Sequence, residues 1–169
     1  MHKMATFMSF TGVVTRIENF VTSAESLGCY KLVTVQNTEG NTVNFVVSPY
    51  TYFIDQAMVS TGDPVIGFYD ADLPVPLIYP PRYTAVVMSR VEPGRNVKVD
   101  FFNDRLISSD GMLQLNIAPY TLVILENEQF FTGNPANRNL AVVYGASTRS
   151  IPAQTTPFVI VVLCRETCG

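Results

Sequence analysis

The sequence predicts an all-β protein that consists of two tandem OB-like or small-barrel β units. Three observations favour this fold. Runs rich in Val, Thr, Phe and Tyr recur along the chain, helical patterns are scarce, and one long segment is echoed later in the same order. With 169 residues, 47% of them hydrophobic, the chain can fill two small cores. We expect the units to span residues 1–93 and 94–169, because "VEPGRN" (91–96) has the Pro, Gly and Asn of a connection.

Five runs in the first unit have the composition of β-strands, and several alternate with the period of two that a half-buried strand requires. In "TVNFVVS", for example, Val43, Phe45 and Val47 share one face. "NTEGN" (37–41) has the Asn and Gly of a hairpin turn between two runs. The five runs are residues 10–20, 30–36, 42–48, 64–70 and 83–91.

Two places interrupt this strand pattern. Gly12, inside the first run, indicates a β-bulge or a sharp bend. Residues 51–60 suit one or two helical turns, with Thr51 as a candidate N-cap. Five strands with a short helical connector between the third and the fourth have the layout of an OB-type barrel, although the same content also suits an SH3-like barrel or a short sandwich.

Residues 48–88 and 118–163 share short matches in the same order, which indicates an internal duplication. The second copy is shortened at its N-terminus, where "NVKVDFF" (96–102) is its only candidate first strand. The matches are Pro49, Tyr50 and Thr51 with Pro119, Tyr120 and Thr121; Ile54 with Ile124; Thr61 and Gly62 with Thr132 and Gly133; Pro64 with Pro135; Tyr69 and Ala71 with Tyr144 and Ala146; and Val86 and Val87 with Val161 and Val162.

Each copy contains a proline-bearing loop between its last two strands. The loop of the first copy (69–83) is apolar, and that of the second (144–158) is polar. Loops that differ on similar scaffolds are frequent sites of function, because rigid strands present them. We therefore expect binding or interface residues in these loops. They are Leu73, Pro74, Pro76, Leu77, Ile78, Tyr79 and Pro80 in the first, and Arg149 in the second.

Catalytic and metal chemistry find little support in the sequence. The single histidine, His2, lies at a terminus, and no glycine-rich phosphate loop follows a strand. Zinc would have to use His2, Cys29, Cys164 and Cys168, whose spacing is not typical of a zinc site. We expect Cys29 and Cys164 to fill the core and Cys168 to lie on a free tail. The prediction is therefore no enzyme, no catalytic residue, no metal and no cofactor.

Isolated polar and aromatic residues favour ordinary structural roles. Asp70 and Asp72 would share a face of an extended strand, which suits an acid–base pair but equally a solvated strand end. Arg149 could bind a carboxylate or phosphate, or could pair with a neighbouring acid. Tyr30, with Lys31 and Arg16 beside it, could stack on nucleic acid or sugar, although aromatic residues spread over every strand are more typical of a core.

Charge and hydropathy narrow the classes of partner. The net charge of −3 and the lack of a basic cluster argue against nucleic-acid binding. No apolar run approaches the ~18 residues of a membrane span, and the first residues do not have the pattern of a signal peptide. We therefore expect a cytoplasmic protein with no nucleic-acid or membrane partner.

The chain resembles an uncharacterised family of small bacterial β proteins, mostly from spore-forming Firmicutes. The segments that carry the resemblance are "GVVTRIE", "VSPYTYFID", "GDPVIGFYDADLPVPLIYPPRYTAVVM" and "VVYGASTRSIPAQ", within residues 10–163. The paired proline-rich loops are its most specific parts. The resemblance implies a β architecture and brings no activity, cofactor or catalytic residue. Related domains also look like accessory modules of secreted multidomain proteins.

Two classes of function follow from these observations. The first is a non-catalytic binding or assembly module that uses the proline-rich loops, with a second copy of the chain or another protein as partner. A loop that folds back and caps its own barrel is the structural alternative. The second class is a small-molecule or oligosaccharide binder, or an enzyme, that uses Asp70, Asp72 and Arg149 in a cleft between the two β units.

Overall fold

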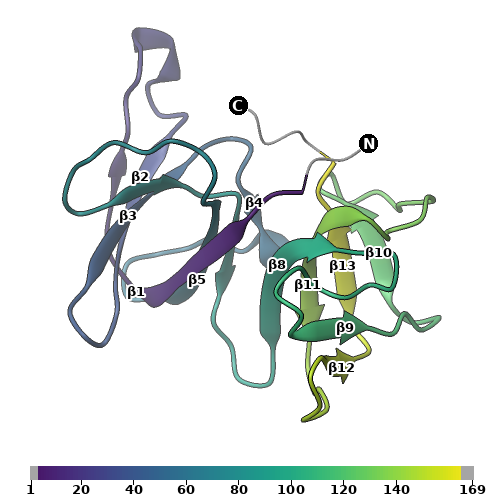
Figure 1. Cartoon of the computed structure of the whole chain (residues 1–169). Helices are drawn as coiled ribbons and strands as arrows, with labels where there is room; N and C mark the ends of the chain where they lie inside the picture. The colour runs from purple at the N-terminus through teal and green to yellow at the C-terminus, as the bar shows by residue number, and fades with distance from the viewer. Residues whose placement is uncertain (1–3, 165–169) are drawn as a thin grey trace. The chain divides into compact units, whose positions relative to one another are not determined.

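The regular secondary structure of the protein is almost all β, as the computed structural model of residues 4–164 shows (Figure 1). Within these residues the helical elements are two short 3-10 turns, η1 (Ala24–Ser26) and η2 (Ile54–Gln56). The all-β prediction is confirmed. The helix expected within residues 51–60 is reduced to η2, and its N-cap is Phe53 rather than Thr51.

The described chain divides into two compact units at the segment "VEPGRN". The first unit is Phe7–Val91, and the second consists of residues 92–164 together with residues 4–6. Residues 4–6 thus belong with the second unit, although the sequence places them beside the first. Ala5 is buried there, and its N–H lies 3.5 Å from Oδ1 of Asn139.

The first unit is a single sheet of seven strands in the order β4-β7-β5-β1-β2-β3-β6. All five runs predicted as strands lie in it, the last one as two pieces. The strands are β1 (Phe7–Asn19), β2 (Lys31–Gln36), β3 (Thr42–Val47), β4 (Tyr52–Phe53), β5 (Pro64–Asp70), β6 (Arg82–Thr84) and β7 (Val87–Arg90).

This sheet closes on itself through the segment that contains β6 and β7. The strand β6 pairs in parallel with β3, whereas β7 pairs antiparallel with β5. Two residues, Ala85 and Val86, separate them, and their N–H groups donate to the carbonyls of Val46 in β3 and Phe68 in β5. Successive residues of one segment therefore bridge β3 and β5, two strands that β1 and β2 separate in the sheet order.

The alternation of strand residues fills the core of the first unit. Val43 and Phe45 of β3 are buried as predicted, and Val47 packs against the same cluster. Gly67 of β5 permits the close approach of the Phe45 ring, since an added Cβ would lie 2.6 Å from it. The cluster consists of Val14, Val33, Val35, Val43, Phe45, Val65, Ala85 and Met88.

The prediction of a bulge at Gly12 is wrong in position. The register of β1 against β2 shifts between Val14 and Arg16. Gly12 instead allows the two strands to approach closely, because a Cβ there would lie 2.7 Å from the carbonyl carbon of Gln36. Glycine is thus required by the approach of a neighbouring backbone rather than by a bulge.

The second unit contains a four-stranded sheet, ordered β10-β13-β11-β8, and a two-stranded sheet of β12 and β9. Its core includes Phe102, Leu140, Val142, Ile160 and Val162. The strands are β8 (Asn96–Phe102), β9 (Leu113–Leu115), β10 (Leu122–Leu125), β11 (Arg138–Tyr144), β12 (Ala153–Thr155) and β13 (Val159–Val162).

The strand pairings of the second unit correspond to those of the first. The parallel pair β10–β13 matches β4–β7, and the parallel pair β9–β12 matches β3–β6. The antiparallel pairs β11–β13 and β8–β11 match β5–β7 and β1–β5. The counterpart of β2 is reduced to the bridges Phe102–Ser108 and Ile107–Gln114. The second unit is therefore a shorter version of the same pairing scheme.

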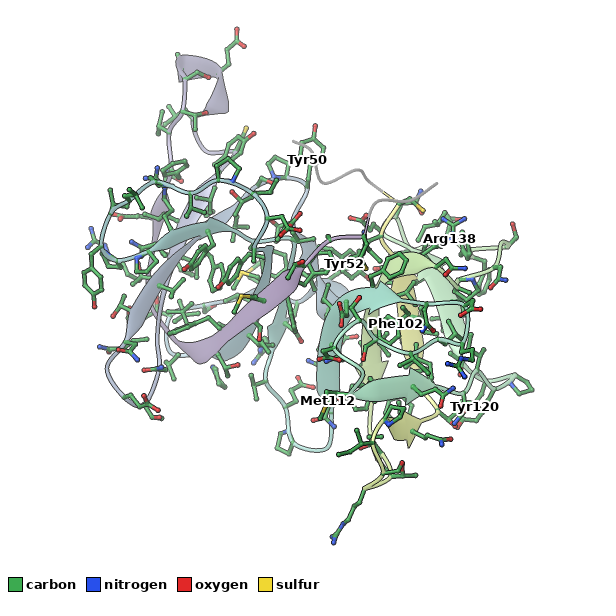
Figure 2. All side chains as sticks on the ribbon, in the orientation of Figure 1. Tyr50, Tyr52, Phe102, Met112, Tyr120 and Arg138 are labelled. Atoms are coloured by element: carbon green, nitrogen blue, oxygen red, sulfur yellow. The ribbon has the colours of Figure 1, made fainter. Side chains whose placement is uncertain are left out.

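The Pro-Tyr-Thr motif has the same structural role in both units. The Thr51 hydroxyl accepts from the Ser48 N–H (3.0 Å) and donates to the Ala85 carbonyl (2.8 Å). The Thr121 hydroxyl accepts from the Ala118 N–H (3.2 Å) and donates to the Pro157 carbonyl (2.8 Å). The tyrosines of the two motifs, labelled in Figure 2, are exposed. The threonine therefore accounts structurally for the motif.

Candidate functional site

The proline-rich loop connects β5 to β6 and forms no strand over residues 71–81. Its start is a turn in which the N–H of Asp72 donates to Oδ1 of Asp70 (3.0 Å) and the N–H of Leu73 donates to the Asp70 carbonyl (3.3 Å). Its end is fixed by the Pro81 carbonyl, which accepts from the Asn44 N–H of β3 (2.9 Å). Both ends are thus tied to the sheet, while proline, which has no N–H, keeps the middle out of it.

The predicted loop residues fall into two groups. Leu73 is half-buried and, with Pro74 and Pro76, lines a cavity. Leu77 is fully exposed, and Ile78 and Tyr79 are 50% and 80% exposed. The half-buried Pro80 follows Tyr79 through a cis peptide bond. The first part of the loop therefore covers a cavity, and its tip (residues 77–79) lies in solvent rather than in the core of its own unit.

The cavity has a volume of about 340 Å³ and lies entirely within the first unit. A neighbouring hollow of about 180 Å³ shares with it Tyr69, Asp70, Leu73, Val75 and Tyr83. The lining residues come from the β1–β2 connection, from β3, from the end of β5, from the loop and from β6. They are Phe20, Thr22, Tyr30, Val46, Ser48, Tyr69, Asp70, Leu73, Pro74, Val75, Pro76, Arg82, Tyr83 and Thr84.

Two stacked tyrosines form one side of this cavity. The rings of Tyr69 (β5) and Tyr83 (β6) are 3.9 Å apart and inclined by 8°, and Tyr69 also meets the core ring of Phe45 at 6.3 Å. Burial, together with the hydrogen bond and electrostatic interaction with Tyr83, raises the pKa of Tyr69 to about 12. The side chain of Tyr69 is therefore an uncharged phenol at neutral pH.

One cation lines the cavity. The guanidinium of Arg82, at the start of β6, lies 5.1 Å from the centre of the Phe20 ring, a cation–π contact. Phe20 is held there because its N–H donates to the Tyr30 carbonyl (2.9 Å) across the β1–β2 connection. Among the described residues no carboxylate forms an ion pair with Arg82. The N–H donors of Arg82 are therefore not used on an acid of this part of the chain.

The cavity is also lined by one carboxyl group, that of Asp70, whose charge is opposite to that of Arg82. Asp70 is only 4% exposed, and its Oδ1 accepts the Asp72 N–H. No described residue donates a hydrogen bond to its Oδ2. Asp70 is buried and Asp72 is exposed, so the two side chains do not share the solvated strand face that their spacing suggests.

Arg149, the predicted residue of the second loop, lies elsewhere. Its side chain is exposed in the second unit, and neither of the two cavities above includes it. Hydrogen bonds of its own hydroxyl groups order the loop around it. The hydroxyl oxygens of Thr148 and Ser150 lie 2.7 Å apart, and the Ser150 hydroxyl donates to the Pro152 carbonyl (2.8 Å). Arg149 and Asp70 thus belong to different units.

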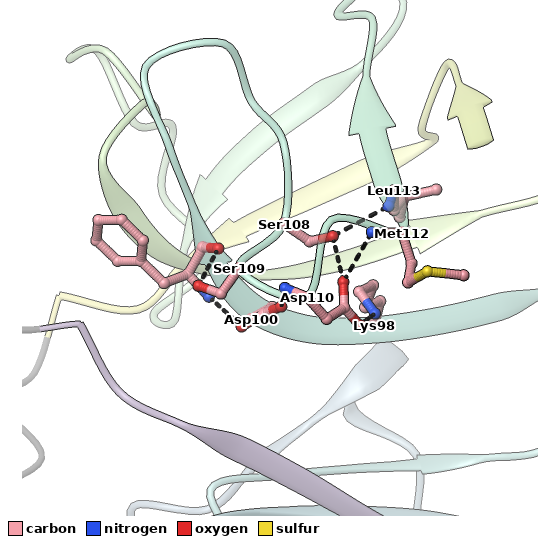
Figure 3. Close-up of polar contacts among 8 residues, drawn as sticks. Lys98, Asp100, Ser108, Ser109, Asp110, Met112 and Leu113 are labelled. Atoms are coloured by element: carbon pink, nitrogen blue, oxygen red, sulfur yellow. Dashed lines mark hydrogen bonds and ion pairs between the residues drawn. The ribbon is translucent and has the colours of Figure 1, made fainter. Parts of the chain in front are cut away.

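A polar cluster in the second unit has a structural role (Figure 3). The Lys98 ammonium lies 2.6 Å from Oδ2 of Asp110, whose Oδ1 accepts the Ser108 hydroxyl (2.6 Å) and the Met112 N–H (3.0 Å). Burial opposes ionisation of Asp110, but Lys98 and these donors outweigh it and lower its pKa. For the neighbouring Asp100, burial prevails and raises the pKa. The polar groups of the cluster thus bond to one another, and they fix the turn before β9.

The cysteines do not occupy the positions expected of them. Cys29 and Cys164 are exposed and free, so the prediction that they fill the core is wrong. His2 and Cys168 lie outside the described residues. Within residues 4–164, the His, Cys, Asp and Glu side chains form no group of three that could hold a metal ion. No helix in this range is long and apolar enough to cross a membrane.

Compared with known protein families and with curated protein sequences, the chain matches none of them. Of the lining residues, the sequence predicts Leu73, Pro74 and Pro76 as binding residues and offers Asp70 as an alternative candidate. It does not single out Arg82, and it favours a core position for Tyr30. The only local signal for Arg82 is its position directly after the prolines, in "YPPRY".

Proposed function

We propose that the protein is a non-catalytic binding module whose site is the cavity beneath the proline-rich loop. The observation that carries the proposal is the cavity itself, whose volume of about 340 Å³ combines an aromatic wall with one arginine and one buried carboxyl group. Small-molecule sites are typically concave and mostly apolar, with a few polar groups that orient the ligand. The cavity has this composition.

The stiffness of the site supports a binding role. Both ends of the loop are hydrogen-bonded to the sheet, and Tyr69 stacks on Tyr83 between them. Proline restricts the backbone in the free state, so that less conformational entropy is lost when a ligand orders the loop. A ligand would therefore meet a site that is largely formed in advance.

We further propose that both units are OB-like and arose by internal duplication. The closed pairing scheme of the first unit, the parallel contact of β3 with β6, and the repetition of this scheme in the second unit support the proposal. OB folds bind ligands with the loop after the first strand and the loop before the last. In the first unit these loops contain Phe20 and Leu73, and both line the cavity.

Ligand-observed NMR on a mixed library of small aromatic acids, amino acids and sugars tests the binding role. We expect saturation-transfer signals with the wild-type protein. Val75→Trp, which puts a large ring at the cavity wall, should abolish them, because Val75 lines the cavity. Leu77→Trp is the matched control, since Leu77 lies in the same loop but is fully exposed. Equal signals from both variants would contradict the assignment of the site.

Self-association is the second candidate role of the loop. Leu77, Ile78 and Tyr79 are adjacent, apolar and exposed, and contiguous apolar surface typically marks an interface. A second copy of the chain is the partner we propose for this tip. We also propose a cytoplasmic location without a nucleic-acid partner, supported by the exposed free thiols of Cys29 and Cys164 and by the net charge of −3.

A further inference from the structure

We infer that the cavity binds an apolar amino acid or a short apolar peptide as a zwitterion, with the ligand carboxylate on Arg82 and its ammonium on Asp70. The inference rests on the proposed binding role of the cavity and names the class of ligand. It is drawn from two charged side chains of opposite sign that line one small, mostly apolar cavity.

Arg82 is suited to a carboxylate. Its position over the ring of Phe20 holds the guanidinium at the cavity, and no acid of the described residues neutralises it. Arginine presents a planar fork of N–H donors that matches the two oxygens of a carboxylate. An uncharged sugar would leave this charge without a counter-charge.

Asp70 is suited to an ammonium group. The residue is 4% exposed, and within the described chain only the Asp72 N–H donates to its carboxyl group. A carboxylate with spare acceptor capacity can accept a charged donor, and hydrogen bonds between charged groups are stronger than those between neutral ones. A phosphate or a second carboxylate at this position would be repelled, which argues against nucleotides and dicarboxylates.

The other lining residues determine which kind of side chain and which size of ligand fit the cavity. Apart from the two charged and three hydroxyl side chains, the lining is aromatic or apolar and includes Tyr30, Tyr83, Leu73 and Pro74. The volume of about 340 Å³ is near the lower end of the range of ~300–1,000 Å³ for small-molecule sites. This favours a molecule the size of an amino acid or a dipeptide over a longer chain.

Calorimetric titration with four probes tests the inference on the wild-type protein. The probes are L-phenylalanine, L-phenylalaninamide (which has no carboxylate), N-acetyl-L-phenylalanine (which has no ammonium) and L-leucyl-L-phenylalanine. We expect at least one of the two zwitterions to bind about tenfold or more tightly than both blocked compounds, since each blocked compound loses a charge-assisted contact. The better of the two zwitterions shows whether the site takes an amino acid or a peptide.

Two variants assign the contacts. In Arg82→Gln the preference for L-phenylalanine over its amide should fall to about one, while the preference for a free ammonium persists. In Asp70→Asn, which retains an acceptor for the Asp72 N–H, the preference for a free ammonium should fall to about one instead. Arg90→Gln is the control, because Arg90 belongs to the same unit but not to the cavity lining, and it should bind as the wild type does.

The outcomes separate this inference from the proposed function. Equal affinity of the wild type for the zwitterions and the blocked compounds would overturn the inference. Binding of a sugar or an aromatic acid, but of no zwitterion, would also overturn it. If Val75→Trp abolished that binding, the cavity would nevertheless remain a binding site. If no compound of the library binds to the wild type, both the inference and the proposed function fail.

Discussion

The rings of Tyr69 and Tyr83 stack at a centroid distance of 3.9 Å and thereby join the two strands between which the proline-rich loop runs. Tyr69 is the last residue but one of β5, and Tyr83 is the middle residue of β6. The loop thus starts and ends at one aromatic pair. This pair fixes the loop over the cavity, while the exposed tip extends beyond it.

Replacing Tyr83 tests this anchoring role. In Tyr83→Leu the stack is lost, and we expect the free energy of unfolding to fall by about 0.5–1.5 kcal/mol beyond the effect of the lost apolar area. Urea denaturation measures the change. Tyr83→Phe keeps the ring and is the matched control. A Leu variant as stable as the Phe variant would show that the stack does not contribute.

The raised pKa of Tyr69 predicts a stability change in alkali. The pKa is about 12 in the folded protein, against 10.0 for an ordinary tyrosine, because burial and Tyr83 disfavour the phenolate. The folded state therefore holds this proton more tightly than the unfolded state does. The resulting stabilisation is complete below pH 10.0 and is lost as the pH rises towards 12.

Difference titration of wild type and Tyr69→Phe at the phenolate absorbance band measures this ionisation. The wild type should show one additional phenol that ionises close to pH 12 in the folded protein. The stability advantage of the wild type over Tyr69→Phe should shrink in the same range. An additional phenol that ionises near pH 10, as in a model peptide, is the result that would contradict the environment described for Tyr69.

The two Pro-Tyr-Thr motifs should respond alike to substitution. In both Thr51→Val and Thr121→Val a hydroxyl that bridges two backbone segments is lost. Each loss leaves backbone groups without a partner and should cost about 1–3 kcal/mol. Thr→Ser at the same positions should cost less, because the hydroxyl is kept. A large cost at one position and none at the other would argue against equivalent units.

Self-association through the loop tip is tested by the double variant Leu77→Ser and Ile78→Ser. We expect sedimentation to show an oligomer for the wild type and a monomer for the variant, with the melting temperature of the fold unchanged. Leaving such side chains in water forgoes roughly 1.5–3 kcal/mol each, which a second copy would recover. Met58→Ser is the control, because Met58 is equally apolar and 84% exposed but lies outside the loop. A monomeric wild type would rule out this role.

The strands could be predicted from the sequence because alternation depends on neighbours along the chain. Val43 and Phe45 illustrate this, since their spacing alone places both in the core. The segment 51–60 shows the limit: tertiary contacts place Thr51 against Ala85 and leave only η2 as a helical turn. Exposure of Cys29 and Cys164 shows that residue type is a weak guide to burial at isolated positions.

The candidate site could be predicted only in part. The proline-rich loop is visible as a composition, but its division into a covering part and an exposed tip is not. Arg82 gains its role from Phe20, which is 62 positions away in the chain and reaches it only through the fold. The sequence offers Asp70 as a candidate beside Asp72 and Arg149, but its burial at the cavity is visible only in the structure, because its sequence neighbours suggest a solvated strand end.

Amide chemical-shift mapping with the tightest-binding compound of the library tests the central claim most directly. We predict that the shifted signals cluster within residues 20–22, 69–76 and 82–84, which contain most of the cavity lining, and that Val75→Trp removes them. Signals that instead cluster around Arg149 and Phe158 in the second unit, or that scatter without a cluster, would contradict the assignment of the cavity as the binding site.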